Sequence, residues 1–448
     1  MPNAAIVPAV DQDDGTARPA SRSSYPEPAK AHFALLILAL VAFFVSMDTN
    51  ISSLLLEPMK HELRLTDIQV GIVQGVAFGA TYGLCAIPMG MVIDRVRRLP
   101  LMLMSLISWS GAMALAGLSH SLGLLVVSRV ALGVVTAFLA PGSLSVLSDL
   151  YRPERRAIAT SIYAVGGAVG SAAAILLGGL LFDALTQFVS RSPQGLFGLT
   201  PWRTLYVGFA VLSLALTPFL ARVSEPVRQE VQDASGHNRF SELWSYRAFL
   251  APLLGGMLFL AAAAAAIASW APPALMRLYG QTPGQFAGWM SLVTLFGGVT
   301  GALIGGQLAN LGQRRGGVKG LFFPGVIAAL ACLPAAFVAV SPSVLTFGAL
   351  MAVATVFCSA GAVVVVIGIN VRMPNELRGT TLGLNVLVMA LCGAGLAPTG
   401  VALATRALGG DLMLGYGIAA IAAPCALLSA FFFWLTMRSS SDGASEPS

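Results

Sequence analysis

Two charged side chains lie where a charge is costly, inside long apolar segments. Asp48 falls about fifteen residues into the apolar run 33–55, and Arg129 about eight residues into the run 122–148. A charge in a hydrocarbon core costs about 3 kcal/mol on insertion scales, so it needs a partner or water. At about 1.5 Å per helical residue, both side chains fall at similar depth in the same half of a membrane. The sequence therefore predicts that Asp48 and Arg129 can pair.

Two interpretations of this pair stay open. In the first, Asp48 and Arg129 form an ion pair that only holds two helices together. In the second, the pair is switchable: Arg129 binds an anionic group of a substrate through its planar guanidinium, while Asp48 takes a proton or remains as counter-ion. Charged residues inside a membrane are functional by default, so we predict a transport role for at least one of the two.

Few other polar side chains share the apolar runs with this pair. Beyond residue 249 these runs contain no Asp, Glu, Lys or Arg at membrane depth. A site that is charged on one side and apolar on the other suits an amphipathic organic anion or a lipid-like molecule better than a sugar, which needs more hydroxyl partners. The candidate lining residues, each with packing between helices as its alternative role, are Gln74, Tyr82, Tyr163, Trp270 and Asn385.

The other reactive side chains show no pattern of catalysis or metal binding. The five cysteines fall inside apolar runs, where we expect small buried side chains. The histidines lie at or outside the ends of these runs, at positions 32, 61, 120 and 237. A membrane enzyme would need a cluster of His, Asp or Glu near a membrane face. We therefore expect no enzyme, no cofactor, no metal and no nucleic-acid partner. A non-transporting membrane sensor or scaffold is the alternative from another class.

Twelve apolar runs position these residues. Only 10% of the 448 residues are charged and 56% are hydrophobic, whereas soluble domains carry about 25% charged residues. Each run is long enough to cross a hydrocarbon core as a helix. The runs cover about 33–55, 70–93, 100–118, 122–148, 157–182, 202–222, 249–271, 286–308, 319–340, 344–371, 379–403 and 412–437. We predict an all-α integral membrane protein with twelve transmembrane helices in two pseudo-symmetric six-helix halves.

The charges give a domain plan and an orientation. With both termini inside, nineteen Lys and Arg lie on the inner side and six in outer loops, as the positive-inside rule requires. We predict a disordered cytoplasmic tail at 1–32, a six-helix half at 33–222, a cytoplasmic linker at 223–248, a second six-helix half at 249–437 and a cytoplasmic tail at 438–448. Scarce lysine beside abundant Arg, Ala and Gly is typical of a GC-rich bacterial genome, so we expect the inner (plasma) membrane.

Two charged loops recur in both halves, which indicates a duplicated six-helix unit. Three positions of the first loop recur 216 residues later: Gly90, Asp94 and Arg98 correspond to Gly306, Asn310 and Arg314. The loops after the second and fourth runs contain candidate gating residues, with a plain positive-inside loop as the alternative. These candidates are Gly90, Asp94, Arg95, Arg98, Asp149, Glu154 and Arg156.

The segment Gly90-Met-Val-Ile-Asp94-Arg95-Val-Arg97-Arg98 resembles the signature loop of the major facilitator superfamily. Arg129, with Gly133 four residues later, is similar to the arginine motif of that family. The resemblance implies a central cavity lined by the first, fourth, seventh and tenth helices. It also implies that Asp94 approaches the start of the eleventh helix, near residues 378–381, when the carrier opens outward.

Within that family, Asp48, Arg129 and the stretch Trp270 to Arg277 are similar to the spinster-like branch. This branch includes carriers of sphingoid and lysophospholipid-type lipids. The sequence departs from it at Thr49 and Thr136, where the branch usually has an arginine and an acid. Lipid cargo and coupling through a pair of acids therefore do not carry over with the resemblance.

The sequence predicts a secondary active transporter that moves a small amphipathic organic molecule by alternating access, with proton symport as one form of coupling. The alternatives are a drug or metabolite efflux carrier and an uncoupled facilitator. The expected partners are the substrate, protons and the lipid bilayer, and we expect a monomer.

Overall fold

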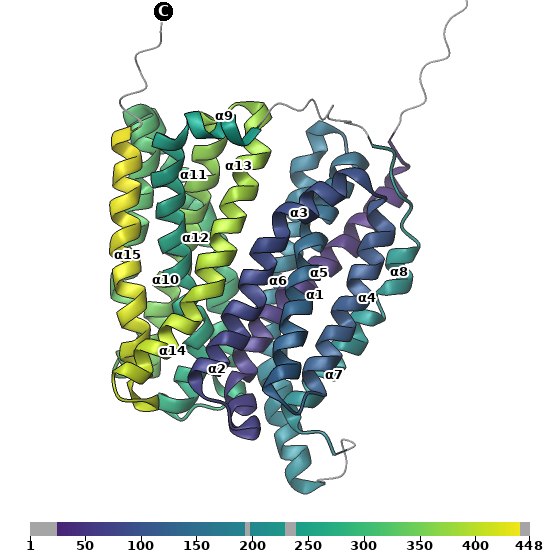
Figure 1. The fold of residues 1–448 in the computed structure, drawn as a ribbon, viewed down its shortest axis with the longest axis vertical. Helices are drawn as coiled ribbons and strands as arrows, with labels where there is room; N and C mark the ends of the chain where they lie inside the picture. The colour runs from purple at the N-terminus through teal and green to yellow at the C-terminus, as the bar shows by residue number, and fades with distance from the viewer. Residues whose placement is uncertain (1–24, 193–197, 229–238, 440–448) are drawn as a thin grey trace, which may run out of the picture.

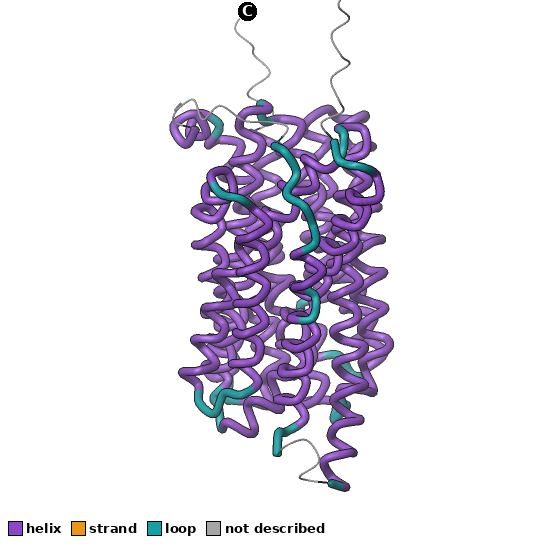
Figure 2. The backbone as a smooth tube through the Cα atoms, turned by 90° about the vertical axis from the view of Figure 1, so that its right-hand side faces the viewer, coloured by secondary structure: helices purple, strands orange, loops and turns teal. Residues whose placement is uncertain are grey.

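The computed structural model describes residues 25–192, 198–228 and 239–439, and these residues are helical nearly throughout. Figure 2 shows helices joined by short loops, and the described residues contain no strand. Eleven helical segments among them are long and apolar enough to cross a membrane. A twelfth, from Asn375 to Ala407, consists of shorter pieces in sequence. The all-α, twelve-helix architecture predicted from the apolar runs is confirmed.

The first half contains six spans, several of which begin at a proline, whose fixed φ angle suits the first helical turn. The spans are α1 (Pro28–Leu63), α2, η1 and α3 together (Asp67–Gly71, Ile72–Ala80, Thr81–Arg95), α4 (Arg98–Gly117), α5 (Leu122–Leu150), α6 (Pro153–Arg191), and α7 with α8 (Pro201–Leu214, Thr217–Ala221). Helix α1 starts at Pro28, so residues 28–32 of the segment expected as a tail are helical, whereas residues 1–24 lie outside the described residues.

The second half follows a short linker helix, α9 (Arg239–Ser245). Its elements are α10 (Arg247–Tyr279), α11 (Pro283–Ala335), η2 (Val338–Val340), α12 (Val344–Arg372), α13 (Asn375–Val388), η3 (Met389–Leu396), α14 (Ala397–Ala407), η4 (Asp411–Met413) and α15 (Leu414–Ser439). Helix α11 contains two spans, because the backbone turns at Gly316 and Gly317. Gly317 has a φ of 59°, which glycine adopts without steric cost.

The two halves pack through pairs of helices that are far apart in the sequence. Helix α6 packs against α11, and α2 with η1 packs against η3 with α14. Both η1 and η3 are π-helical segments, a form found frequently at functional sites. Figure 1 shows α2 and α14 side by side at the end of the bundle opposite the carboxyl terminus. We call this the distal end, and the end where α1 begins and α15 finishes the proximal end.

Glycines show how differently the halves meet at the two ends. A Cβ at Gly71 would lie 2.9 Å from the Cα of Thr399, and one at Gly179 would lie 2.6 Å from the Pro283 carbonyl oxygen. Both glycines therefore permit backbone contact between the halves at the distal end. At the proximal end, a Cβ on Gly90 or Gly306 would meet nothing within 4 Å.

Candidate functional site

The structure brings Asp48 and Arg129 together in the middle of the first half. Asp48 lies on α1 and Arg129 on α5, and each residue is only 2% exposed. The Nη1 atom of Arg129 lies 3.3 Å from both carboxylate oxygens of Asp48. The two charges compensate each other in a segment where neither has access to bulk water.

A third helix completes this pair. The Nη2 atom of Arg129 donates to the hydroxyl of Tyr206 on α7, and the guanidinium lies 5.5 Å from the centre of the tyrosine ring. The Nε of Arg129 is buried without a hydrogen-bond partner in the described chain. The guanidinium thus retains an unsatisfied donor at Nε. Tyr206 carried no sequence signal, because a tyrosine in an apolar run resembles ordinary packing.

Gln74 and two tyrosines are the other candidates from the first half. Ser52, one helical turn after Asp48, donates to the side-chain oxygen of Gln74 at 2.5 Å. Tyr82 stacks on Phe78, with ring centres 6.1 Å apart. Gln74 is therefore joined to the turn that carries Asp48, whereas Tyr82 and Tyr163 are half-buried on other helices of the first half.

The two candidates from the second half do not join this network. Trp270 is fully buried and its indole donates to the Pro398 carbonyl at 3.0 Å, which ties α10 to α14. Asn385 on α13 has its amide nitrogen 3.7 Å from the sulfur of Met389, and its side-chain oxygen is buried without a partner in the described chain. Trp270 packs between helices here, while Asn385 retains an unsatisfied acceptor.

A buried ion cluster at the distal end joins the halves. Arg277 on α10 donates to Glu57 on α1 at 2.7 Å and to both carboxylate oxygens of Asp67 on α2 at 2.7 and 2.8 Å. All three side chains are largely buried. This cluster could not be predicted from the sequence, because charges near the ends of apolar runs are common and only the fold brings these three residues together.

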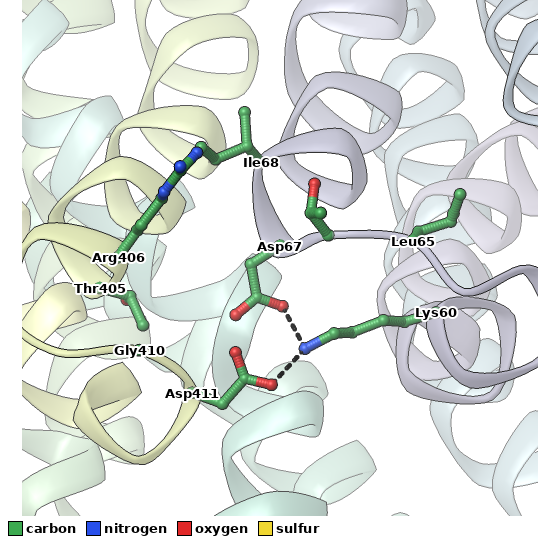
Figure 3. Close-up of a pocket in the computed structure, with 9 residues that line it drawn as sticks. Lys60, Leu65, Asp67, Ile68, Thr405, Arg406, Gly410 and Asp411 are labelled. Carbon is green, nitrogen blue, oxygen red and sulfur yellow. Dashed lines mark hydrogen bonds and ion pairs between the residues drawn. The ribbon is translucent and has the colours of Figure 1, made fainter.

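Lys60 extends the cluster to η4, the short helix before α15. Its amine lies 2.8 Å from Asp67 and 2.6 Å from Asp411, as the dashed lines in Figure 3 show. These residues line a cavity of about 370 Å³ that also includes Thr405 and Arg406. The lysine therefore connects an acid of the first half with an acid of the second.

Two further contacts at the distal end are hydrogen bonds in which at most one partner is charged. Ser53 on α1 donates to the Ser269 carbonyl on α10 at 2.9 Å. Asp183 on α6 accepts from the Thr282 hydroxyl at 2.6 Å and from the Gly284 backbone N–H at 3.1 Å, at the start of α11. With the ion cluster, these contacts hold α1, α2 and α6 of the first half against the second half.

At the proximal end, Arg98 is the centre of a network within the first half. Its side chain is buried and lies 2.5 Å from Asp149 and 3.1 Å from Glu225. Glu225 also accepts from the backbone N–H groups of Arg98 at 3.0 Å and Leu99 at 2.9 Å. This carboxylate therefore caps the amino terminus of α4, where the helix dipole favours a negative charge.

The segment 223–228 acts as a strap over the loop between α3 and α4. While Glu225 caps α4, Arg228 donates to the carbonyls of Ile93 at 2.7 Å and Val96 at 2.8 Å, at the end of α3. Burial opposes ionisation of Glu225, but hydrogen bonds from Leu99 and Arg98 outweigh burial and lower its pKa below the ordinary value. From the sequence, these linker charges look simply solvated.

The other gating candidates are more dispersed. Arg156 donates to the Tyr151 carbonyl at 3.1 Å, Glu154 is exposed, and Gly90 faces open space. The side chains of Asp94 and Arg95 lie outside the described residues. The structure thus brings Arg98 and Asp149 into one network and leaves the contact expected of Asp94 as a prediction.

Two bundles of six spans are the architecture of one large fold of membrane transport proteins. The chain belongs to the Major Facilitator Superfamily, because the model of that family matches residues 38–398. A curated relative, an MFS-type efflux pump of Mycolicibacterium smegmatis, is 28% identical over 288 residues. The match covers 63% of each chain, so the chain spans less than two thirds of that relative's length.

Solved structures share the fold at low sequence identity. A bacterial homolog of the human lysosomal transporter Spinster, in an inward-facing and unoccupied conformation, superposes with a TM-score of 0.78 at 22% identity. That match covers 94% of this chain and all of the other. The nucleoside transporter NupG gives a TM-score of 0.66 at 13% identity, covering 91% of this chain and 99% of its own.

We predict that Glu225→Gln lowers the free energy of unfolding by about 1 kcal/mol at pH 7, because α4 loses a charged cap. The pKa of Glu225 is lowered in the folded protein, so its stabilisation is complete above the ordinary pKa of about 4.3. It disappears as the pH falls through the lower folded value. Thermal unfolding between pH 7 and pH 3.5 should therefore show the parent and variant curves converging on acidification.

Glu242→Gln is the matched control, because Glu242 is an exposed acid of the linker helix. Its unfolding should follow the parent at every pH. A Glu225→Gln protein as stable as the parent at pH 7 would contradict the capping role.

Proposed function

We propose that the chain is a secondary active transporter that moves a small amphipathic organic anion by alternating access. The observation that carries this proposal is the guanidinium of Arg129, which is buried, paired with Asp48 and left with one unused donor at Nε. A carboxylate or phosphate of a substrate would satisfy that donor, and arginine suits such planar acceptors.

The rest of the site favours an amphipathic substrate. The first half supplies the charge, whereas the spans of the second half contain no Asp, Glu, Lys or Arg at membrane depth. An apolar group of the substrate would lie against that half, and the unsatisfied oxygen of Asn385 would accept a hydrogen bond from a donor group of the substrate. Tyr82, Tyr163 and Gln74 are proposed to line the same site.

Alternating access is supported by the different packing at the two ends. The Arg277 cluster holds the halves together at the distal end, and Gly90 and Gly306 have open space at the proximal end. In the proposed cycle the distal cluster separates and the glycine-containing proximal surfaces approach. Asp94 would then reach the start of α13. We assign the proximal end to the cytoplasm of a bacterial inner membrane because it carries most of the arginines, and we propose a monomeric carrier.

Efflux of a drug or metabolite is a second candidate. Two curated relatives of M. smegmatis favour it by name, the MFS-type efflux pump and the multidrug efflux pump LfrA, which is 29% identical over 158 residues. Uncoupled facilitation follows if Asp48 and Arg129 only hold helices together. A non-transporting sensor is the least supported candidate, because it does not explain why Asp48 and Arg129 are charged and buried.

Arg129→Lys should reduce transport of the accepted organic anion at least about tenfold in proteoliposomes. The lysine keeps the charge but loses the fork that holds Asp48, Tyr206 and an acceptor at once. Uptake and efflux of a panel of anionic, neutral and cationic amphipaths, with and without a pH gradient, identify that anion. Arg315→Lys, at an exposed position of α11 just before its turn at Gly316, is the control and should transport normally. Full activity in Arg129→Lys, with normal thermal unfolding, would reduce Arg129 to a structural counter-ion.

Asp48→Asn should abolish accumulation driven by a pH gradient and leave downhill exchange intact. Asparagine mimics the protonated acid permanently, so no proton can be carried at this position. The variant should also unfold more readily, because it leaves Arg129 as an uncompensated buried charge.

Asp48→Glu, which keeps a titratable carboxyl group, should retain part of the accumulation. Coupling through Asp48 is wrong if Asp48→Asn still concentrates substrate in response to the pH gradient. If exchange and thermal stability disappear together, the pair is structural and the carrier is a facilitator.

A further inference from the structure

A second site lies at the proximal end, between the start of α1 and the start of α6. Two adjoining cavities of about 390 and 380 Å³ share His32, Tyr151 and Arg155 as lining residues. We call them together the α1–α6 groove. It lies at the helix ends, about twenty residues along α5 from Arg129, and none of the residues that line it belongs to the central network.

One end of the groove is charged. Arg152 and Arg155 line it at the first turn of α6, and both are exposed. The amino terminus of this 39-residue helix adds partial positive charge at the same place. Glu154 is the acid in the lining, so the two arginines and this acid sum to one positive charge. The charge of this end is complementary to a singly charged anion that contains a phosphate.

Tyr151 gives an independent indication of a ligand. It lines both cavities and is only 9% exposed. Its hydroxyl is buried and has no hydrogen-bond partner in the described chain. Nearly all buried polar groups in proteins are satisfied, so an orphan hydroxyl in a groove needs an explanation. An acceptor oxygen that enters the groove would supply the missing partner.

The other end of the groove is apolar and continues onto a membrane-spanning surface. Leu35, Ile158 and Ile162 line it. Ile158 is 64% and Ile162 is 46% exposed, on a helix that crosses the membrane. A charged pocket at the helix ends that continues into an apolar track matches a headgroup followed by an acyl chain. A free phosphate would make no contact with the apolar part of the groove.

We propose that an anionic phospholipid binds in the α1–α6 groove. Its phosphate lies at Arg152 and Arg155, the Tyr151 hydroxyl donates to a headgroup oxygen, and an acyl chain follows Ile158 and Ile162. The lipid joins the beginning of α1 to the beginning of α6. This site is separate from the transported substrate and does not depend on its identity.

The test measures lipid binding to the full-length protein in detergent by native mass spectrometry, with phosphatidylglycerol and phosphatidylcholine of the same acyl chains. Phosphatidylglycerol should bind more tightly. Arg152→Gln with Arg155→Gln should weaken its binding at least about tenfold, since each arginine near a membrane surface contributes to anionic lipid binding. Tyr151→Phe removes only the hydroxyl and should weaken binding a few-fold.

The matched control is Arg314→Gln with Arg315→Gln, which removes two exposed arginines from α11 of the second half, just before its turn at Gly316. It should bind phosphatidylglycerol like the parent. Three results would overturn the proposal: equal binding by the groove variant and this control, equal affinity for the two lipids, or displacement of the lipid by equimolar inorganic phosphate. Thermal unfolding of each variant shows that it is folded, and Tyr151→Phe tests the site even if the arginine variant is unstable.

Discussion

The ion cluster around Arg277 is the interaction on which the arrangement of the two halves depends. A largely buried guanidinium sits between Glu57 and Asp67, each contributed by a different helix of the first half. Buried charges that lose their partners are strongly destabilising, so this cluster persists only while α1, α2 and α10 stay together. Lys60 adds an ion pair with Asp411 and so connects η4, the short helix before α15, to the cluster. The glycine contacts between α2 and α14 and between α6 and α11 lie at the same distal end.

The Asp48–Arg129 pair, unlike the Arg277 cluster, lies entirely within one half of the protein. Asp48, Arg129 and Tyr206 lie on α1, α5 and α7, which are all in the first half, so the halves can move relative to each other without breaking their hydrogen bonds. In the proposed transporter, the charged part of the substrate site therefore stays intact within the first half, while the contacts between the halves change. The strap of Glu225 and Arg228 also makes its contacts within one half, because it fixes the loop between α3 and α4 to the first half.

The helices and the depth of the central charges could be predicted from the sequence. The contacts between distant segments could not. Lipid forces every backbone polar group into a helix, so the apolar runs specify the twelve spans. The rise of a helix was enough to place Asp48 and Arg129 at one level. Tyr206 was missed because a tyrosine in an apolar run is expected to pack between helices like any other aromatic residue. Arg277 and Glu225 were missed because charges at span ends normally face water, and only the fold buries them.

Distances between spin labels on the two halves test the proposed rocking motion most directly. One pair at the distal end uses Leu118 and Leu345, and one at the proximal end uses Ile158 and Val371, all exposed positions. In lipid nanodiscs, the protein with intact Arg277 should give a short distal and a long proximal distance. Arg277→Gln should lengthen the distal distance and shorten the proximal one. Unchanged distances at both ends, in a variant that remains folded, would contradict the claim that this cluster holds the carrier closed at its distal end.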